Sequence, residues 1–345
     1  MPSDPDPRDL SNFEFTFNSP LSSSGTAALD DLIDTQSIST SVREPQEENG
    51  RTYHGYHAHS YHFPNDPREQ ERLDYQHRII KTVMDNRLYL APWSRRNSPR
   101  RVLDVATGTG KWAIELGDEF PGSLVVGTDL SPIQPDEAPP NVHFFVEDSR
   151  CEWLFGEPFD YVHARMTAGA WEDMREEVVR RAFENLRPGG WLEAQEVDPR
   201  PVCDDGSMDE EGDAFCRWER DLEAASEAAG RPITVAPRLR EWFAEEGFVE
   251  VQETRFMLPI NGWPADERLK RIGRWWQENL IDGISGFTLA LHHRFRGKTA
   301  AQIEVDLMDA RRAIRDERVH AYHTLHVVWG RKPGPAVSPY GLSIS

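Results

Sequence analysis

The sequence predicts an α/β fold in which a mainly parallel sheet carries helices on both faces. Two apolar runs of strand length, near 101–105 and 123–128, are separated by a helical pattern over 111–119. A glycine-containing turn, 106–110, joins the first run to that helix. Strands that alternate with helices in this way form parallel sheets.

Ahead of the first strand, residues 68–87 have the period of a helix. Leu73, His77, Ile80 and Met84 recur at three- and four-residue steps, the spacing that places side chains on one helix face. We expect this helix to cover a ligand pocket at the edge of the sheet.

The remaining elements follow from apolar runs and glycine stops. Further strands are expected near 142–146, 159–163, 190–196, 248–257 and 322–329. Further helices are expected at 172–186, 212–229 and 236–246. Residues 259–318 are too long for a hairpin loop and contain helical runs, so we expect an insertion that forms a lid.

This pattern predicts five segments. They are a disordered acidic tail at 1–50, an N-terminal helical segment at 51–98, a core at 99–258 and 320–333, a helical lid at 259–319 and a flexible tail at 334–345. The first segment is rich in Ser, Asp, Pro and Glu, a composition that buries too little apolar surface to offset the entropy of ordering. Its alternating Phe13, Phe15 and Phe17 are a candidate partner-binding stretch.

The turn after the first strand predicts a nucleoside site. Gly108 and Gly110 lack a Cβ, so the backbone can turn sharply and its amides can approach a ligand at a helix N-terminus. Asp129 ends the next strand, where its carboxylate can accept hydrogen bonds from ribose hydroxyls. Gly108, Gly110 and Ala113 also fit a dinucleotide fingerprint, but Asp104 inside the motif would repel a pyrophosphate. The third strand ends in Glu147 and Asp148, which suit the donors of an adenine edge.

The chain resembles a known family at these motifs. DVATGTG (104–110) is similar to the D/E-x-G-x-G-x-G motif of class I S-adenosylmethionine methyltransferases, and LRPGGWLEAQEVD (186–198) resembles their fifth-strand entry. The segments 61–77, 127–135, 139–148, 159–166 and 320–333 resemble the fungal LaeA-like methyltransferases. The similarity runs from about Tyr53 to Pro333, and it implies a seven-stranded Rossmann-like sheet with an antiparallel last strand.

The resemblance implies S-adenosyl-L-methionine as cofactor and assigns roles to residues. Gly108 and Gly110 would hold its methionine end, Asp104 its amino group, Asp129 its ribose and Asp148 its adenine. The expected cofactor-binding residues are Asp104, Ala106, Thr107, Gly108, Gly110, Asp129, Leu130, Asp148 and Ser149. One departure is visible, because Ala106 stands where the family motif has its first glycine.

Three residues near the ends of strands four and five are the catalytic candidates, because ligands of open α/β sheets bind beyond the carboxyl ends of the strands. His163 is either a general base, with a reference pKa near neutrality, or a hydrogen-bonded structural residue. Arg165 either orients a substrate carboxylate or pairs with Glu196 or Asp198. Glu196 is the third candidate.

Composition restricts the partners. A net charge of −20 argues against nucleic-acid binding, which requires Lys and Arg to neutralise phosphates. The three cysteines have no CxxC spacing and predict neither disulfides nor a zinc site, and we read the run His54, His57, His59 and His62 as non-metal. No apolar run is long enough for a membrane helix, and an intracellular location, in cytoplasm or nucleus, is expected.

The function expected from these observations is methylation of a small natural product in fungal secondary metabolism. The alternative is a LaeA-like nuclear regulator that works through velvet-type protein partners. A NAD-binding oxidoreductase is a third reading.

Overall fold

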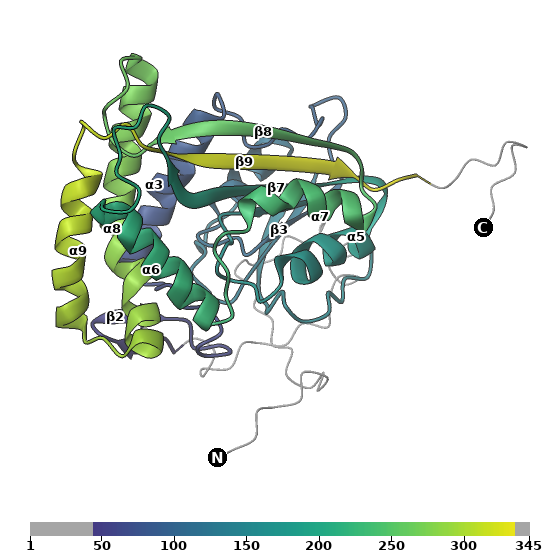
Figure 1. The fold of residues 1–345 in the computed structure, drawn as a ribbon. Coiled ribbons are helices and arrows are strands. Elements are labelled where there is room, and N and C mark those ends of the chain that lie inside the picture. Colours follow the sequence, from purple (N-terminus) through teal and green to yellow (C-terminus); the bar gives the residue numbers. More distant parts are fainter. Residues whose placement is uncertain (1–43, 335–345) are drawn as a thin grey trace, which may run out of the picture.

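The computed structural model describes residues 44–334. Most of the tails expected at 1–50 and 334–345, including the candidate partner-binding stretch with Phe13, Phe15 and Phe17, lies outside the described residues. Its centre is a seven-stranded sheet in the order β5-β4-β3-β6-β7-β9-β8 (Figure 1). The strands are β3 Arg101–Val105, β4 Leu124–Asp129, β5 Val142–Val146, β6 Phe159–Arg165, β7 Leu186–Val202, β8 Val249–Pro259 and β9 Tyr322–Arg331. β9 runs antiparallel to both of its neighbours, so the seven-stranded sheet with an antiparallel last strand is confirmed.

Parallel pairing sets which side chains meet at the ligand edge of the sheet. In the register of β3 with β6, Asp104 lies opposite His163. In the register of β6 with β7, Arg165 lies opposite Gln195. Since β3, β4, β5 and β6 are parallel, their carboxyl ends share one edge, and the segments that follow them come together there.

Helices cover both faces of the sheet, as the alternating side chains of a strand require. Val102 belongs to the apolar cluster on one face and Leu103 to the cluster on the other. The first face is covered by α3 Pro67–Val83, α4 Lys111–Glu119, α6 Ala214–Ala228, α8 Glu267–Arg296 and α9 Ala300–Ile314. The second is covered by η2 Arg175–Arg180, α5 Arg181–Asn185, η3 Ala236–Arg238 and α7 Leu239–Glu246.

Local sequence explains where the key helices start and end. Asp66 caps α3 by accepting a hydrogen bond from the Glu69 amide at 3.0 Å, and Pro67 follows at the first helical position, where it is favoured. Thr299 and Gln302 form a reciprocal capping box at the start of α9. Gly297 ends α8 in the left-handed conformation, which glycine adopts at low cost.

Two sequence predictions need correction. The helix expected at 172–186 is a π-helical turn followed by the short α5, and β7 begins at Leu186 rather than 190 because Leu186 pairs with Phe159 before a bulge. The tail expected to reach residue 50 contains β1 Gln46–Glu48, which pairs with β2 Arg51–Tyr53 in a hairpin.

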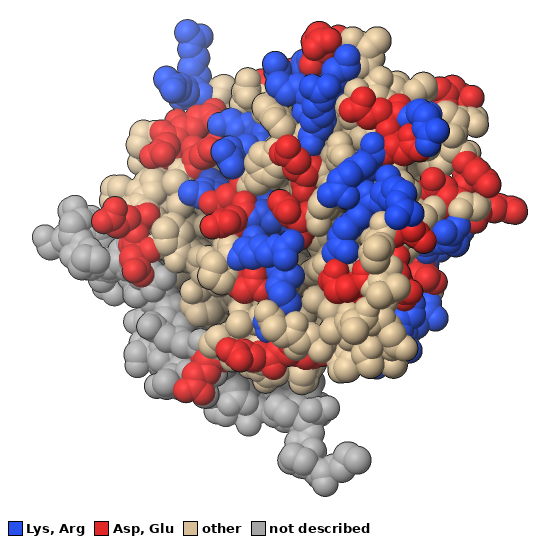
Figure 2. Space-filling model, turned by 90° about the vertical axis from the view of Figure 1, so that its left-hand side faces the viewer, with Lys and Arg blue, Asp and Glu red and all other residues tan. Residues whose placement is uncertain are grey.

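The face that carries α9 has intermixed charges. Figure 2 shows Lys and Arg interspersed with Asp and Glu across this side of the molecule. On α9 and just after it, Arg311 pairs with Glu304 at 2.8 Å, Arg312 with Asp309 at 2.8 Å and Arg318 with Asp316 at 2.6 Å. Mixed signs at such spacing are typical of a solvated helix face.

Candidate active site

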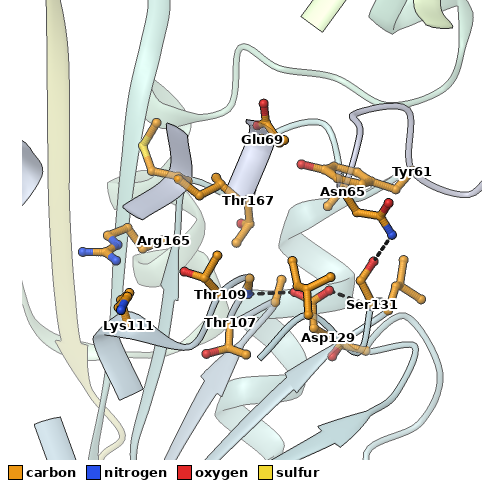
Figure 3. A pocket seen from close by; sticks show the side chains of 18 of the residues that line it. Tyr61, Asn65, Glu69, Thr107, Thr109, Lys111, Asp129, Ser131, Arg165 and Thr167 are labelled. Atoms are coloured by element: carbon orange, nitrogen blue, oxygen red, sulfur yellow. Dashed lines mark hydrogen bonds between the residues drawn. The ribbon is translucent and has the colours of Figure 1, made fainter. Parts of the chain in front are cut away.

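A cavity of about 1120 Å³, including its open mouth, lies at the carboxyl edge of the parallel strands. Its floor comes from the turn after β3 and from the ends of β4, β5 and β6, and its roof comes from residues 61–80 (Figure 3). Among the predicted site residues, those that line it are Ala106, Thr107, Gly108, Asp129, Leu130, Asp148, Ser149 and Arg165.

The turn after β3 is shaped by two left-handed residues. Ala106 has φ of 52° and Gly108 has φ of 60°, and a Cβ on Gly108 would meet nothing nearer than 3.9 Å. Gly110 also has a positive φ, of 76°, but it does not line the cavity. A Cβ there would lie 2.5 Å from the ring of Phe144, so Gly110 is required for packing rather than for ligand contact.

Asp129 is fixed at the cavity wall by backbone amides. Its Oδ2 accepts a hydrogen bond from the Gly108 amide at 2.8 Å, and its Oδ1 accepts one from the Ser131 amide at 2.9 Å. Burial raises the pKa of Asp129 to about 6, against the opposing effect of these two bonds. Each oxygen keeps acceptor capacity beyond the single bond it receives, so the carboxylate can bind two hydroxyls.

Asp104 does not face the cavity. Its Oδ1 lies 2.7 Å from Nδ1 of His163, its Oδ2 accepts a hydrogen bond from the Thr107 hydroxyl at 2.5 Å, and it is buried. Neither Asp104 nor His163 lines the cavity. The prediction that Asp104 binds an amino group of the cofactor does not fit this placement.

His163 is also misplaced for general base catalysis. Its ring is fully buried and stacks on Trp112, with centroids 3.6 Å apart and planes 4° apart. Burial lowers its pKa, against the opposing effect of Asp104. The structural reading of His163, which the sequence left open, is the one that agrees with the structure.

Glu196 acts on the loop after β6 instead of on the cavity. Its Oε1 accepts hydrogen bonds from the Thr167 amide at 2.7 Å and hydroxyl at 2.8 Å, and its Oε2 accepts one from the Ala168 amide at 3.3 Å. Burial raises its pKa to about 7. Glu196 is buried and is not among the residues that line the cavity, whereas Thr167, which it binds, does line it. This placement does not favour the predicted catalytic role of Glu196.

Asp148 lines the cavity but already has two partners. Nδ1 of His57 lies 2.6 Å from its Oδ2, and Arg150 donates from Nε at 2.8 Å and from Nη2 at 2.5 Å. Burial alone would raise the pKa of Asp148, but these bonds outweigh it and lower the pKa. The neighbouring Ser149 hydroxyl lies 3.1 Å from that of Thr128.

The roof of the cavity includes residues that sequence reasoning did not single out. Residues 54–66, which we call the strap, cross the site and are held by His57 to Asp148 and by Asn65, whose amide donates to the Ser131 hydroxyl at 3.2 Å. Tyr61 of the strap lines the cavity, and burial raises its pKa. The strap carries no periodic pattern that could have revealed this position.

One face of α3 completes the roof. Its cavity-lining residues are Glu69, Leu73, Gln76, His77 and Ile80, and their helical spacing was the available signal. The buried Glu69 accepts hydrogen bonds from Nε and Nη2 of Arg72, the latter at 2.6 Å, and Arg72 also donates to Asn279 at 2.9 Å. The cavity-lining face of α3 therefore carries polar and apolar side chains in alternation, from Glu69 at its start to Ile80 near its end.

The insertion at 259–319 does not cover the cavity, because none of the lining residues comes from it. Its long helix α8 packs against α3 and contacts the strap, where the ring of Phe287 meets that of Phe63. In this structure the insertion therefore lies behind the roof of the cavity. Within residues 44–334, no three His, Cys, Asp or Glu side chains gather as metal ligands would, and no helix there is both long and apolar enough to cross a bilayer.

Comparisons with known proteins agree with this geometry. A family profile described as a methyltransferase domain matches residues 75–253. The methyltransferase pytC of Aspergillus terreus is 39% identical over 308 residues, which cover 89% of this chain and 94% of pytC. The secondary metabolism regulator laeA of Monascus pilosus is 38% identical over 295 residues, covering 83% of this chain and 78% of laeA.

A protein of Emericella nidulans, named protein-methionine methyltransferase laeA, is 35% identical over 296 residues, covering 83% of this chain and 76% of its own. Among solved structures, phosphoethanolamine N-methyltransferase 2 of Haemonchus contortus, in complex with phosphomonomethylethanolamine and S-adenosylhomocysteine, matches with a TM-score of 0.42 and 19% identity. That match covers 76% of this chain and 52% of the solved one.

Proposed function

This chain belongs to the class I S-adenosylmethionine-dependent methyltransferases, and we propose that it methylates a small natural product in fungal secondary metabolism. The proposal is supported by the likeness to the methyltransferase pytC and to laeA proteins named as secondary metabolism regulators. S-adenosylmethionine supplies the methyl group as an electrophilic carbon on a sulfonium. Family membership sets aside the oxidoreductase alternative.

The residues at the cavity floor fit this cofactor. The carboxylate of Asp129 would accept the ribose hydroxyls, since both of its oxygens are fixed by amides and retain free acceptor capacity. The turn at Ala106–Gly108 would lie along the methionine end, and Leu130 with Ser149 would border the adenine. The single observation that carries the proposal is the Asp129 carboxylate, held at the cavity wall by the Gly108 amide.

The acceptor would enter on the side of the cavity opposite this floor. Tyr61 and Thr167 lie on facing walls above Asp129 (Figure 3). Burial raises the pKa of Tyr61, so its hydroxyl stays protonated and donates a hydrogen bond rather than removing a proton. Because His163 and Glu196 are also away from the cavity wall, we propose that the chain mainly orients the acceptor and excludes water.

Calorimetric titration with S-adenosylhomocysteine tests the cofactor proposal. We expect the wild-type protein to bind it and Asp129→Ala to lose most of the affinity, because both ribose hydroxyls would lose their acceptor. The exposed Asp118 serves as a control, and Asp118→Ala should bind as the wild type does. No binding to the wild type, or undiminished binding to Asp129→Ala, contradicts the proposal.

A regulatory role is the second candidate, with a protein side chain as acceptor. It is supported by the regulator names of the laeA relatives and by the name protein-methionine methyltransferase of one of them. Met166 lines the cavity with φ of 55°, and a thioether is a nucleophile that needs no deprotonation. A velvet-type partner belongs to this candidate.

Three experiments separate the candidates. Incubation with the methyl donor followed by intact mass measurement would show one added methyl group on the wild type and none on Met166→Leu if Met166 is the acceptor. Deletion of the gene would remove one methyl group from one metabolite if the protein is a tailoring enzyme. Loss of many metabolites, together with recovery of velvet-type proteins in a pull-down, would favour regulation.

A further inference from the structure

Arg165 is a cation at the cavity wall with no carboxylate in ion-pair contact among the described residues. Arg165 is the last residue of β6, and its side chain lines the cavity. There its Nη2 lies 2.8 Å from Nδ1 of His77. Over residues 44–334, no Asp or Glu oxygen lies within 4.0 Å of its guanidinium, as none of the ion pairs includes it. Burial lowers the pKa of Arg165, against the opposing charges of Asp104, Glu115 and Glu196, which lie beyond ion-pair distance.

The two other Lys or Arg side chains that line the cavity differ from Arg165 in this respect. Arg150 pairs with Asp148 at 2.5 Å, and Lys111 lies 3.5 Å from Asp74 and is half exposed. A guanidinium taken out of water without a counter-ion is costly, and an anionic ligand would offset that cost. Because the other two cations have carboxylates beside them, Arg165 is the position in this cavity wall where a ligand carboxylate would gain most.

His77 holds the guanidinium in place from α3. A guanidinium has only donors, so Nδ1 of His77 must be an unprotonated acceptor. Burial, together with the charge of Arg165, lowers the pKa of His77 to about 4, which keeps the ring neutral. On its other side, Nε2 lies 3.2 Å from Glu115, and Glu115 accepts a hydrogen bond from Lys81 at 2.5 Å.

We propose that Arg165 binds the α-carboxylate of the methionine part of S-adenosylmethionine, and that His77 is a positioning residue for it. The proposal rests on the proposed function above. Asp104, the expected partner of the cofactor's amino group, is bound to His163 and Thr107 instead. Recognition of the amino-acid end of the cofactor therefore depends on its carboxylate, which the guanidinium of Arg165 at the end of β6 would bind.

The test compares two ligands that differ in this carboxylate alone, S-adenosylhomocysteine and its decarboxylated counterpart, by calorimetry on the full chain. The wild type should prefer the carboxylate form by about ten- to hundredfold, the value of a charge-assisted hydrogen bond pair. Arg165→Met should lose this preference and keep its affinity for the decarboxylated ligand. Arg78→Met removes an exposed cation from the same helix as His77 and should leave the preference intact.

His77 is tested by two variants. His77→Gln keeps an acceptor for Arg165 and should retain most of the preference, whereas His77→Leu should lose it. Since the measure is a ratio within one protein, a partial loss of folded molecules affects both ligands equally.

The outcomes are distinct. If the wild type binds neither ligand, the proposed function fails, and this inference fails with it. If the wild type binds both but Arg165→Met keeps the preference, the cofactor site stands and Arg165 does not read the carboxylate. A change in acceptor KM alone, with the ligand ratio unchanged, would assign Arg165 to the acceptor and overturn the inference.

Discussion

Nδ1 of His163 lies 2.7 Å from Oδ1 of Asp104, across the pairing of β6 with β3. His163, a candidate base or structural residue, and Asp104, for which the family resemblance implied amine binding, are therefore partners of each other. The Thr107 hydroxyl donates to the other oxygen of Asp104, so the pair anchors the turn that lines the cavity.

Loss of the contact between His163 and Asp104 should lower the stability of the fold and leave the catalytic step unchanged. We expect His163→Leu to lower the free energy of unfolding by about 3–5 kcal/mol, because it leaves the buried Asp104 carboxylate with one donor fewer. Urea unfolding measures it. His163→Gln keeps a donor, so its folded protein should show the wild-type pH profile of kcat. If His163→Gln lost one limb of that pH profile, the result would support His163 as the general base.

The sequence predicted the strands and the position of Asp129 because both depend on apolar burial. A run such as 142–146 must be buried, and an acid at the end of a parallel strand must lie at the ligand edge. Side-chain pairing depends on register between strands, which no single run specifies. The contact of Asp104 with His163 therefore could not be read from either strand alone.

The contacts that hold the strap could not be predicted either, for a different physical reason. Residues 54–66 have no repeating apolar pattern, and single polar contacts such as His57 to Asp148 and Asn65 to Ser131 fix their position. These partners are 91 and 66 residues apart in the chain. For the insertion at 259–319, the sequence indicated helices, but the length of the segment could not predict that its helix α8 packs against α3.

Ionisation of Glu196 should make the stability of the ligand-free protein fall as pH rises. Burial raises its folded pKa to about 7, above the value of about 4.3 in an unfolded chain, so the folded state holds the extra proton between these values. Its contribution is complete below about pH 4 and is lost through pH 7. The side chain of Glu196→Gln cannot ionise. Between pH 5 and 8, the free energy of unfolding of this variant should therefore fall by about 1–3 kcal/mol less than that of the wild type.

Urea unfolding at several pH values checks this prediction. The exposed Glu227 provides a control, and Glu227→Gln should leave the wild-type slope unchanged. An equal fall in Glu196→Gln and in the wild type would mean that Glu196 does not titrate in this range and is ionised throughout.

The contact of His57 with Asp148 should hold the strap closed. His57→Ala removes the bond at 2.6 Å, and we expect faster amide hydrogen exchange over residues 54–60, measured by mass spectrometry. His59 is exposed and lies two positions away, so His59→Ala is a matched control that should exchange as the wild type does. Equal exchange in both variants would show that other contacts hold the strap.

Restoring the family glycine should relieve strain in the turn after β3. Ala106 adopts φ of 52° and lines the cavity, a conformation that costs a residue with a Cβ about 1–2 kcal/mol. Because glycine loses about 0.5–1 kcal/mol more chain entropy on folding, Ala106→Gly should raise the free energy of unfolding by up to about 1 kcal/mol. Removing the methyl group also widens the floor, so S-adenosylhomocysteine should bind a few-fold more tightly.

Ala170 gives the matched comparison for this variant. It also lines the cavity but is not among the residues with positive φ. Ala170→Gly therefore gains no relief of strain and should lower the free energy of unfolding by about 0.5–1 kcal/mol. Thermal and urea unfolding of the two variants should move in opposite directions. If both lose stability equally, the left-handed conformation of Ala106 carries no measurable cost, and its methyl group packs usefully against the turn.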